Sequence, residues 1–135
     1  MSMSINKPYQ AYQNNAVNTA SGGELTLMLY NSCVKFIRQA MKDVEKKDYE
    51  AKNTHIQKAQ KIIQELMITL DQEVEISKQL LSLYDFMYHQ LTEANVRNNT
   101  TTLEEVLDLA IDFRDTWKQV LLKTRKQAPH QGAQV

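Results

Sequence analysis

The 135-residue sequence is poor in the residues that sheets, disulfides and membrane spans require. Three glycines and two prolines are too few for a many-stranded sheet, so the composition favours an all-α fold. The single cysteine, Cys33, cannot form an internal disulfide, which is typical of a reducing compartment, and we expect it to be buried. No apolar run approaches the ~20 residues of a membrane span, and no signal-peptide core is present. The sequence therefore predicts one cytoplasmic domain.

Motifs for catalysis and metal binding are also missing. Sixteen basic residues balance sixteen acidic ones, so nucleic acid or an anionic membrane is not the expected principal partner. The Glu-x-x-His pattern of di-iron bundles, paired cysteines and glycine-rich phosphate loops do not occur. We expect His55 and His89 to lie on the surface, and the acidic edge Asp108, Asp112 and Asp115 to be solvated. The sequence predicts no enzyme, no metal and no cofactor.

Apolar residues recur at helical spacing through the middle of the chain. We expect helices at residues 21–47, 48–70, 74–97 and 101–125, with Asp48 as one N-cap and capping boxes at Ser21 and at Thr101 and Thr102. Asn98 tolerates the left-handed conformation that ends the third helix. Short links then favour an antiparallel up-down-up-down four-helix bundle. Residues 1–20 are expected to form a flexible N-terminal arm, and residues 126–135 a disordered tail.

Each helix has an apolar stripe that we assign to the core. In the first helix this stripe contains Leu25, Met28, Leu29, Cys33, Phe36, Ala40 and Val44, and in the second Ile56, Ala59, Ile62, Ile63, Leu66, Met67 and Leu70. In the third it contains Ile76, Leu80, Leu83, Tyr84, Met87, Leu91 and Ala94, and in the fourth Leu103, Val106, Leu107, Ala110, Phe113, Trp117 and Leu121. Lys52 falls off the stripe of the second helix.

Some apolar residues lie outside these stripes. The first helix has a second arc beside its core stripe, formed by Leu27, Tyr30, Val34, Ile37 and Met41. Such a helix is either central, covered by neighbours on several sides, or it lines a surface that another molecule covers. Leu81 and Tyr88 widen the third helix, and Ile68 is an exposed apolar candidate on the second. Six Met and six Tyr suit a groove that receives an amphipathic segment; the alternative is that they belong to the core or to a homodimer seam.

Isolated apolar residues interrupt the polar N-terminal arm, and three of them lie within eight residues: Ile5, Tyr9 and Tyr12. They either tuck against the first helix or dock onto a partner.

Several segments, in this order, resemble the flagellin-specific export chaperones of the bacterial flagellum, the FliS family. They are residues 8–13 (PYQAYQ), 17–21 (VNTAS), 24–30 (ELTLMLY), 82–88 (SLYDFMY), 91–95 (LTEAN) and 113–118 (FRDTWK). The resemblance covers nearly the whole chain to Lys118; one departure is Gly22, where the family often has a proline.

The resemblance implies a cytoplasmic chaperone that binds the C-terminal segment of flagellin, prevents its premature polymerisation and delivers it to the flagellar type III export gate. On this reading the client groove is expected to consist of Leu27, Tyr30, Val34, Ile37, Met41, Ile68, Leu81, Tyr84 and Tyr88. The arm residues Ile5, Tyr9 and Tyr12 are then expected to cover part of the groove and to dock at the export gate. The alternative is a helical-bundle homodimer or adaptor scaffold without an unfolded client.

Overall fold

The computed structural model describes residues 22–71 and 73–127, with side chains as far as residue 124. It contains helices α2 (Gly22–Glu45), α3 (Tyr49–Thr69), α4 (Glu75–Arg97) and α5 (Thr100–Gln127). These bounds lie within a few residues of the predicted ones. The arm with Ile5, Tyr9 and Tyr12, the Ser21 capping box and the C-terminal tail lie outside the described residues.

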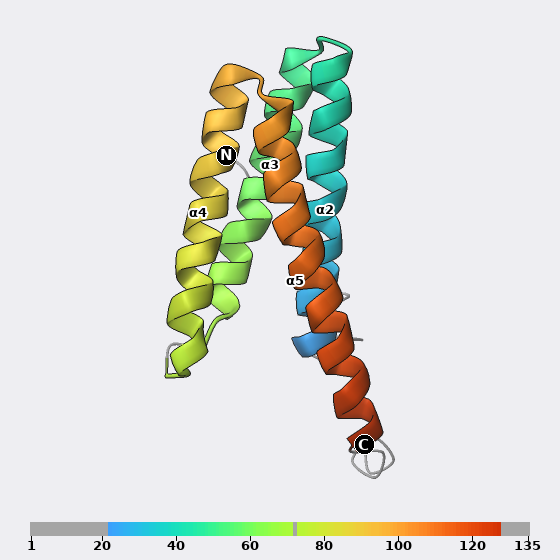
Figure 1. Cartoon of the computed structure of the whole chain (residues 1–135), viewed down its shortest axis with the longest axis vertical. Coiled ribbons are helices and arrows are strands. Elements are labelled where there is room, and N and C mark those ends of the chain that lie inside the picture. Colours follow the sequence, from blue (N-terminus) through green and yellow to red (C-terminus); the bar gives the residue numbers. More distant parts are fainter. Residues whose placement is uncertain (1–21, 72, 128–135) are drawn as a thin grey trace, which may run out of the picture.

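The helices run alternately up and down, joined by short turns (Figure 1). α2 contacts α3 and α5, and α4 closes the ring by contacting α3 and α5. The predicted all-α antiparallel bundle is confirmed. Toward the α3–α4 turn, α4 separates from α5, whose C-terminal half continues along α2 (Figure 1). None of the described helices has the length and hydrophobicity needed to cross a membrane.

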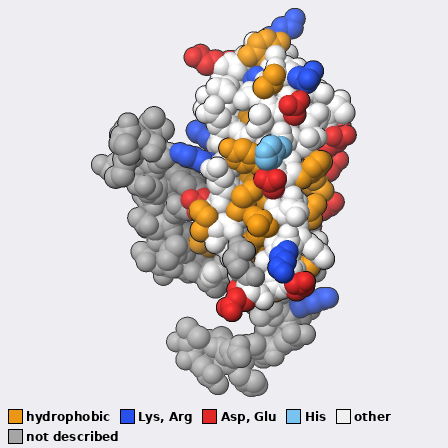
Figure 2. Space-filling view, turned by 90° about the vertical axis from the view of Figure 1, so that its left-hand side faces the viewer, with side chains coloured by type: hydrophobic (Ala, Val, Ile, Leu, Met, Phe, Trp, Pro, Cys, Tyr) orange, Lys and Arg blue, Asp and Glu red, His pale blue; other side chains and the backbone are white. Residues whose placement is uncertain are grey.

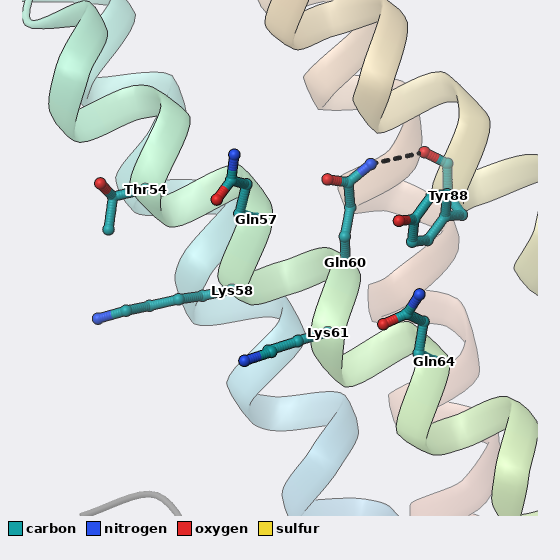
Figure 3. Close-up of a pocket in the computed structure, with 7 residues that line it drawn as sticks. All are labelled: Thr54, Gln57, Lys58, Gln60, Lys61, Gln64 and Tyr88. Carbon is teal, nitrogen blue, oxygen red and sulfur yellow. Dashed lines mark hydrogen bonds between the residues drawn. The ribbon is translucent and has the colours of Figure 1, made fainter. Parts of the chain in front are cut away.

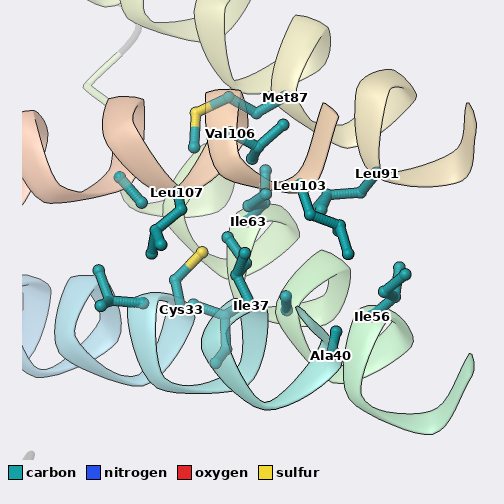
Figure 4. Packing of buried hydrophobic residues seen from close by; sticks show 14 of the residues in the cluster. Cys33, Ile37, Ala40, Ile56, Ile63, Met87, Leu91, Leu103, Val106 and Leu107 are labelled. Atoms are coloured by element: carbon teal, nitrogen blue, oxygen red, sulfur yellow. The ribbon is translucent and has the colours of Figure 1, made fainter. Parts of the chain in front are cut away.

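The core receives side chains from all four helices (Figure 4). α2 contributes Leu29, Tyr30, Cys33, Val34, Ile37 and Ala40 to it. The buried stripe of α2 is therefore rotated from the predicted one, because α3 and α5 cover both of its apolar arcs. Of the two possibilities left open by the sequence, cover by neighbouring helices accounts for most of the second arc, since Tyr30, Val34 and Ile37 are buried. Cys33 is buried as predicted, and burial raises the pKa of its thiol to about 12.

Side chains of the connecting turns fix the ends of the helices. Asp48 caps α3 as predicted, since its Oδ1 accepts a hydrogen bond from the Ala51 amide at 3.1 Å. Asn98 ends α4 in the left-handed conformation, with φ of 53°. The expected capping boxes of Thr101 and Thr102 were wrong: Asn99 Oδ1 accepts from both of their amides, at 2.9 and 3.2 Å. Asparagine holds this position because its short side chain reaches two amides of the first turn.

Polar groups expected on the surface join helices that are distant in sequence. Lys52 is only 5% exposed, and its Nζ donates to the Asn95 carbonyl at 2.6 Å and to Asn98 Oδ1 at 2.5 Å. Its ammonium group thus satisfies acceptors at the C-terminal end of α4, where a positive charge is favourable. His55 is also less exposed than predicted, because its Nδ1 donates to Asp43 Oδ2 at 2.5 Å and its ring stacks on Phe36.

Candidate functional site

A cavity of about 450 Å³ opens between α4, α5 and the start of α2. We call it the apolar groove, since most of its lining is hydrophobic. It is lined by Tyr30, Ile76, Leu80, Leu83, Leu109, Asp112, Phe113, Thr116 and Trp117. Asp112 is the only charged residue among them. A concave apolar surface of this size with few polar groups is the usual form of a binding site.

The groove exists because α5 follows α2 instead of α4. Trp117 Nε1 donates to the Gly23 carbonyl at 2.7 Å, which ties the C-terminal half of α5 to the start of α2. A Cβ atom at Gly23 would lie 2.7 Å from Leu121 Cδ2, so a residue without a side chain permits this close approach. The first turns of α4 are consequently left uncovered by α5. Ile76 is 54% exposed and Leu83 39% exposed, although both were predicted to be core residues.

Three aromatic rings, those of Tyr30, Tyr84 and Phe113, pack together beside the groove. Phe113 stacks on Tyr30 at 5.9 Å between ring centroids and is tilted against Tyr84 at 5.6 Å. The hydroxyls of Tyr30 and Tyr84 share a hydrogen bond of 2.5 Å between buried oxygens. Burial raises the pKa of both hydroxyls, so both stay neutral in the physiological range. The groove therefore borders on a rigid aromatic cluster without formal charge.

The groove residues predicted from the sequence lie in different places in the structure: some in the core, one in the apolar groove and others elsewhere on the surface. Val34, Ile37 and Tyr84 are at most 2% exposed and belong to the core, since the neighbouring helices cover them. Of the nine, Tyr30 alone lines the apolar groove. Leu27 and Met41 are half-buried, whereas Ile68 and Leu81 are exposed. Tyr88 lines a different cavity, between α3 and α4.

This second cavity, of about 570 Å³, is polar (Figure 3). It is lined by Thr54, Gln57, Lys58, Gln60, Lys61, Gln64 and Tyr88. Gln60 joins its two walls, donating from Nε2 to the Tyr88 carbonyl at 3.1 Å and to Thr92 Oγ1 at 2.8 Å. Ile68 follows Lys61 by seven residues and Leu81 precedes Tyr88 by seven, so both lie on the faces that border this cavity.

The sequence interpretation missed most of the apolar groove. Ile76, Leu80, Leu83, Phe113 and Trp117 were assigned to the core. Phe86 could have indicated the groove from the sequence, because it follows Leu83 by three residues and widens the apolar face of α4. In the structure Phe86 is 51% exposed. Figure 2 shows hydrophobic side chains gathered on the side of the molecule that includes α4. Among the residues whose side chains are described, no group of three or more His, Cys, Asp or Glu could hold a metal ion.

An all-α bundle with an apolar groove of this kind is typical of proteins that bind amphipathic segments of other chains. Comparison with known families identifies the chain more closely. The family model described as flagellar protein FliS matches residues 5–124, and the chain belongs to this family. FliS proteins are flagellar secretion chaperones and not enzymes.

Relatives support this assignment, and a solved structure shares the fold. The flagellar secretion chaperone FliS of Bacillus subtilis is 51% identical over 130 residues, covering 96% of this chain and 98% of the relative. Proteins of the same name from Salmonella typhimurium and Escherichia coli are 36% and 33% identical. The Salmonella alignment covers 83% of this chain and 85% of the relative; the Escherichia alignment covers 79% and 81%. A crystal structure of a bacterial flagellar chaperone has the same fold, with a TM-score of 0.71 at 18% identity over 87% of this chain and 97% of that one.

Proposed function

We propose that this protein is a cytoplasmic chaperone that binds the C-terminal segment of flagellin in the apolar groove. By covering that segment it prevents premature polymerisation, and it delivers the client to the flagellar type III export gate. The observation that carries the proposal is the exposure of Ile76 and Leu83 beside a cavity lined by Leu109, Phe113 and Trp117. Membership of a family of secretion chaperones supports a flagellar client.

Binding in this groove follows from burial of apolar surface. Each large apolar side chain moved from water into the groove contributes about 1.5–3 kcal/mol. A client that is disordered when free offsets part of this gain, since its backbone must be ordered on binding. The result is specific but reversible holding, as a chaperone requires when it hands its client on. No step in this mechanism requires a cofactor.

The contact surface that we propose differs from the one suggested by the sequence. It includes Tyr30 and the other residues that line the apolar groove, and it omits the core residues Val34, Ile37 and Tyr84. The partly or fully exposed residues outside the groove are retained as candidates for a further stretch of client; they are Leu27, Met41, Ile68, Leu81 and Tyr88.

The test is calorimetric titration with a peptide of about the last 40 residues of the cognate flagellin, long enough as a helix to span the bundle. We expect saturable one-to-one binding with a negative heat-capacity change. Leu83→Asp should weaken binding at least tenfold while changing the melting temperature little, because Leu83 is 39% exposed. The matched control is Val96→Asp, which alters a 74% exposed residue at the other end of α4.

Two outcomes would contradict the groove assignment. Equal binding by the Leu83→Asp and Val96→Asp variants would place the client elsewhere. No binding by the unaltered protein, together with a stable dimer on a sizing column, would favour the homodimer in place of the chaperone. Deleting residues 1–17, which include Ile5, Tyr9 and Tyr12, tests the proposed gate-docking arm: binding to the export gate should fall.

A further inference from the structure

The two edges of the apolar groove differ in charge. Asp112 lies at the α5 edge, and Asp108, four residues earlier, is on the same exposed face of this helix. Among the residues whose side chains are described, no Lys or Arg forms an ion pair with either carboxylate. Asp115 differs, since Arg114 Nε lies 3.0 Å from its carboxylate. Within the part of the chain whose side chains are described, the α5 edge thus has two carboxylates that form no ion pair.

The α4 edge has one carboxylate, that of Glu75 at its N-terminal end, and Lys78 Nζ lies 3.7 Å from it. Gln79 and Phe86 each follow a groove residue, Ile76 and Leu83, by three positions, and so lie on the same flank of the helix. Both are exposed. An occupant of the groove therefore meets carboxylates on one side and an amide and an aromatic ring on the other.

We propose that Asp112, with Asp108, recognises basic residues along one edge of the bound segment and thereby fixes the direction in which this segment lies. This inference rests on the proposed function. Turning an amphipathic helix end for end keeps its apolar face in the groove but exchanges its two edges. A segment with Lys or Arg beside its apolar stripe then meets Asp112 in one direction only. The apolar groove supplies most of the affinity, and the acidic edge discriminates between the two directions.

The experiment uses the full chain and the same flagellin peptide, titrated at low and at high salt. Asp112→Asn should weaken binding about two- to fivefold, the range of exposed ion pairs, and Asp108→Asn/Asp112→Asn should weaken it further. The affinity of the double variant should depend less on salt than that of the unaltered protein. Glu45→Gln is the matched control, because it removes an exposed carboxylate at the end of α2 and should leave the affinity unchanged.

Direction is measured separately, with a nitroxide label at either end of the peptide and amide resonances of α4 as reporters. In the unaltered protein, each label should broaden resonances near only one end of the groove, at Ile76 or at Leu83. In the Asp108→Asn/Asp112→Asn variant, each label should broaden both. Binding that Asp112→Asn and Glu45→Gln affect equally, or two directions in the unaltered protein, would overturn this inference and leave the groove assignment standing. Failure of the unaltered protein to bind the peptide would overturn both.

Discussion

Removing the Tyr84 hydroxyl should destabilise the bundle by about 1–2 kcal/mol. The hydroxyls of Tyr30 and Tyr84 lie 2.5 Å apart, and the two residues are 6% and 2% exposed. Tyr84→Phe deletes this hydrogen bond and leaves the Tyr30 hydroxyl buried without a protein partner, which costs about 1–3 kcal/mol. We expect the lower part of that range, because Tyr30 lines the groove and a small shift of its side chain would let water replace the lost partner.

The double variant Tyr30→Phe/Tyr84→Phe makes the test sharper. It removes both hydroxyls, so no unpaired polar group remains, and it should be no less stable than Tyr84→Phe alone. The interaction energy between the two sites should then be about 1 kcal/mol. Urea unfolding followed by circular dichroism measures Tyr30→Phe, Tyr84→Phe and the double variant, with Tyr49→Phe as a control at a 44% exposed tyrosine. Additive losses, or a Tyr84→Phe variant as stable as the unaltered protein, would refute the reasoning.

Three further predictions concern groups that join distant helices or are fully buried. Lys52→Met should cost about 1–3 kcal/mol in urea unfolding, because the α4 acceptors Asn95 and Asn98 lose their donor. Burial lowers the pKa of Lys52, so the unfolded state binds more protons just below its ordinary value of 10.5. The contribution of Lys52 to stability should rise with pH in that window, and Lys52→Met should lack this contribution. The raised Cys33 pKa, about 12 against 9.0, has the opposite effect: its contribution to stability is present below pH 9.0 and is lost as pH rises, at up to about 1.4 kcal/mol per pH unit. Cys33→Ala should remove this loss between pH 9.0 and 10.0, below the ordinary pKa of Tyr30 and Tyr84, whose pKa values are also raised. Trp117→Ala should lower the free energy of unfolding by about 3 kcal/mol, mostly from lost packing, and Trp117→Phe should recover most of it in a thermal melt.

Local sequence was sufficient for the helices because their signals are local. Periodic apolar residues and the Asp48 cap specify where each helix forms, whatever lies beside it. The residue that caps a helix could not be predicted where several capping residues compete. Asn99, Thr101 and Thr102 all offer side-chain oxygens near the start of α5, and only the conformation of the turn selects Asn99.

The polar contacts inside the bundle could not be predicted, because their partners are far apart in sequence. Lys52 and the Asn95 carbonyl are separated by 43 residues, and Gln60 and Thr92 by 32. A lysine or glutamine beside an apolar stripe has the pattern of a solvated residue. Only the packing of α3 on α4 places acceptors and donors opposite these side chains.

The apolar groove has the same pattern as a core, which explains why the sequence interpretation confused the two. Met87 is buried, and Leu80 packs against the core while also lining the groove. Ile76 and Leu83 lie beside them on the same face of α4 and line the groove. Periodicity assigns all of them to one face, and whether a face is covered depends on the path of the neighbouring helix.

That path is set by a contact between residues 94 positions apart, the hydrogen bond from Trp117 to Gly23. Residues that hold α5 on α2 therefore determine the width of the groove even where they only border it. Trp117 and Phe113 both line the groove and pack against the core, so substitutions there should change stability and client affinity together. Ile76 and Leu83 are 54% and 39% exposed, so substitutions there should change mainly the affinity. The binding surface can accordingly adapt to its client along α4, while α5 and α2 preserve the fold.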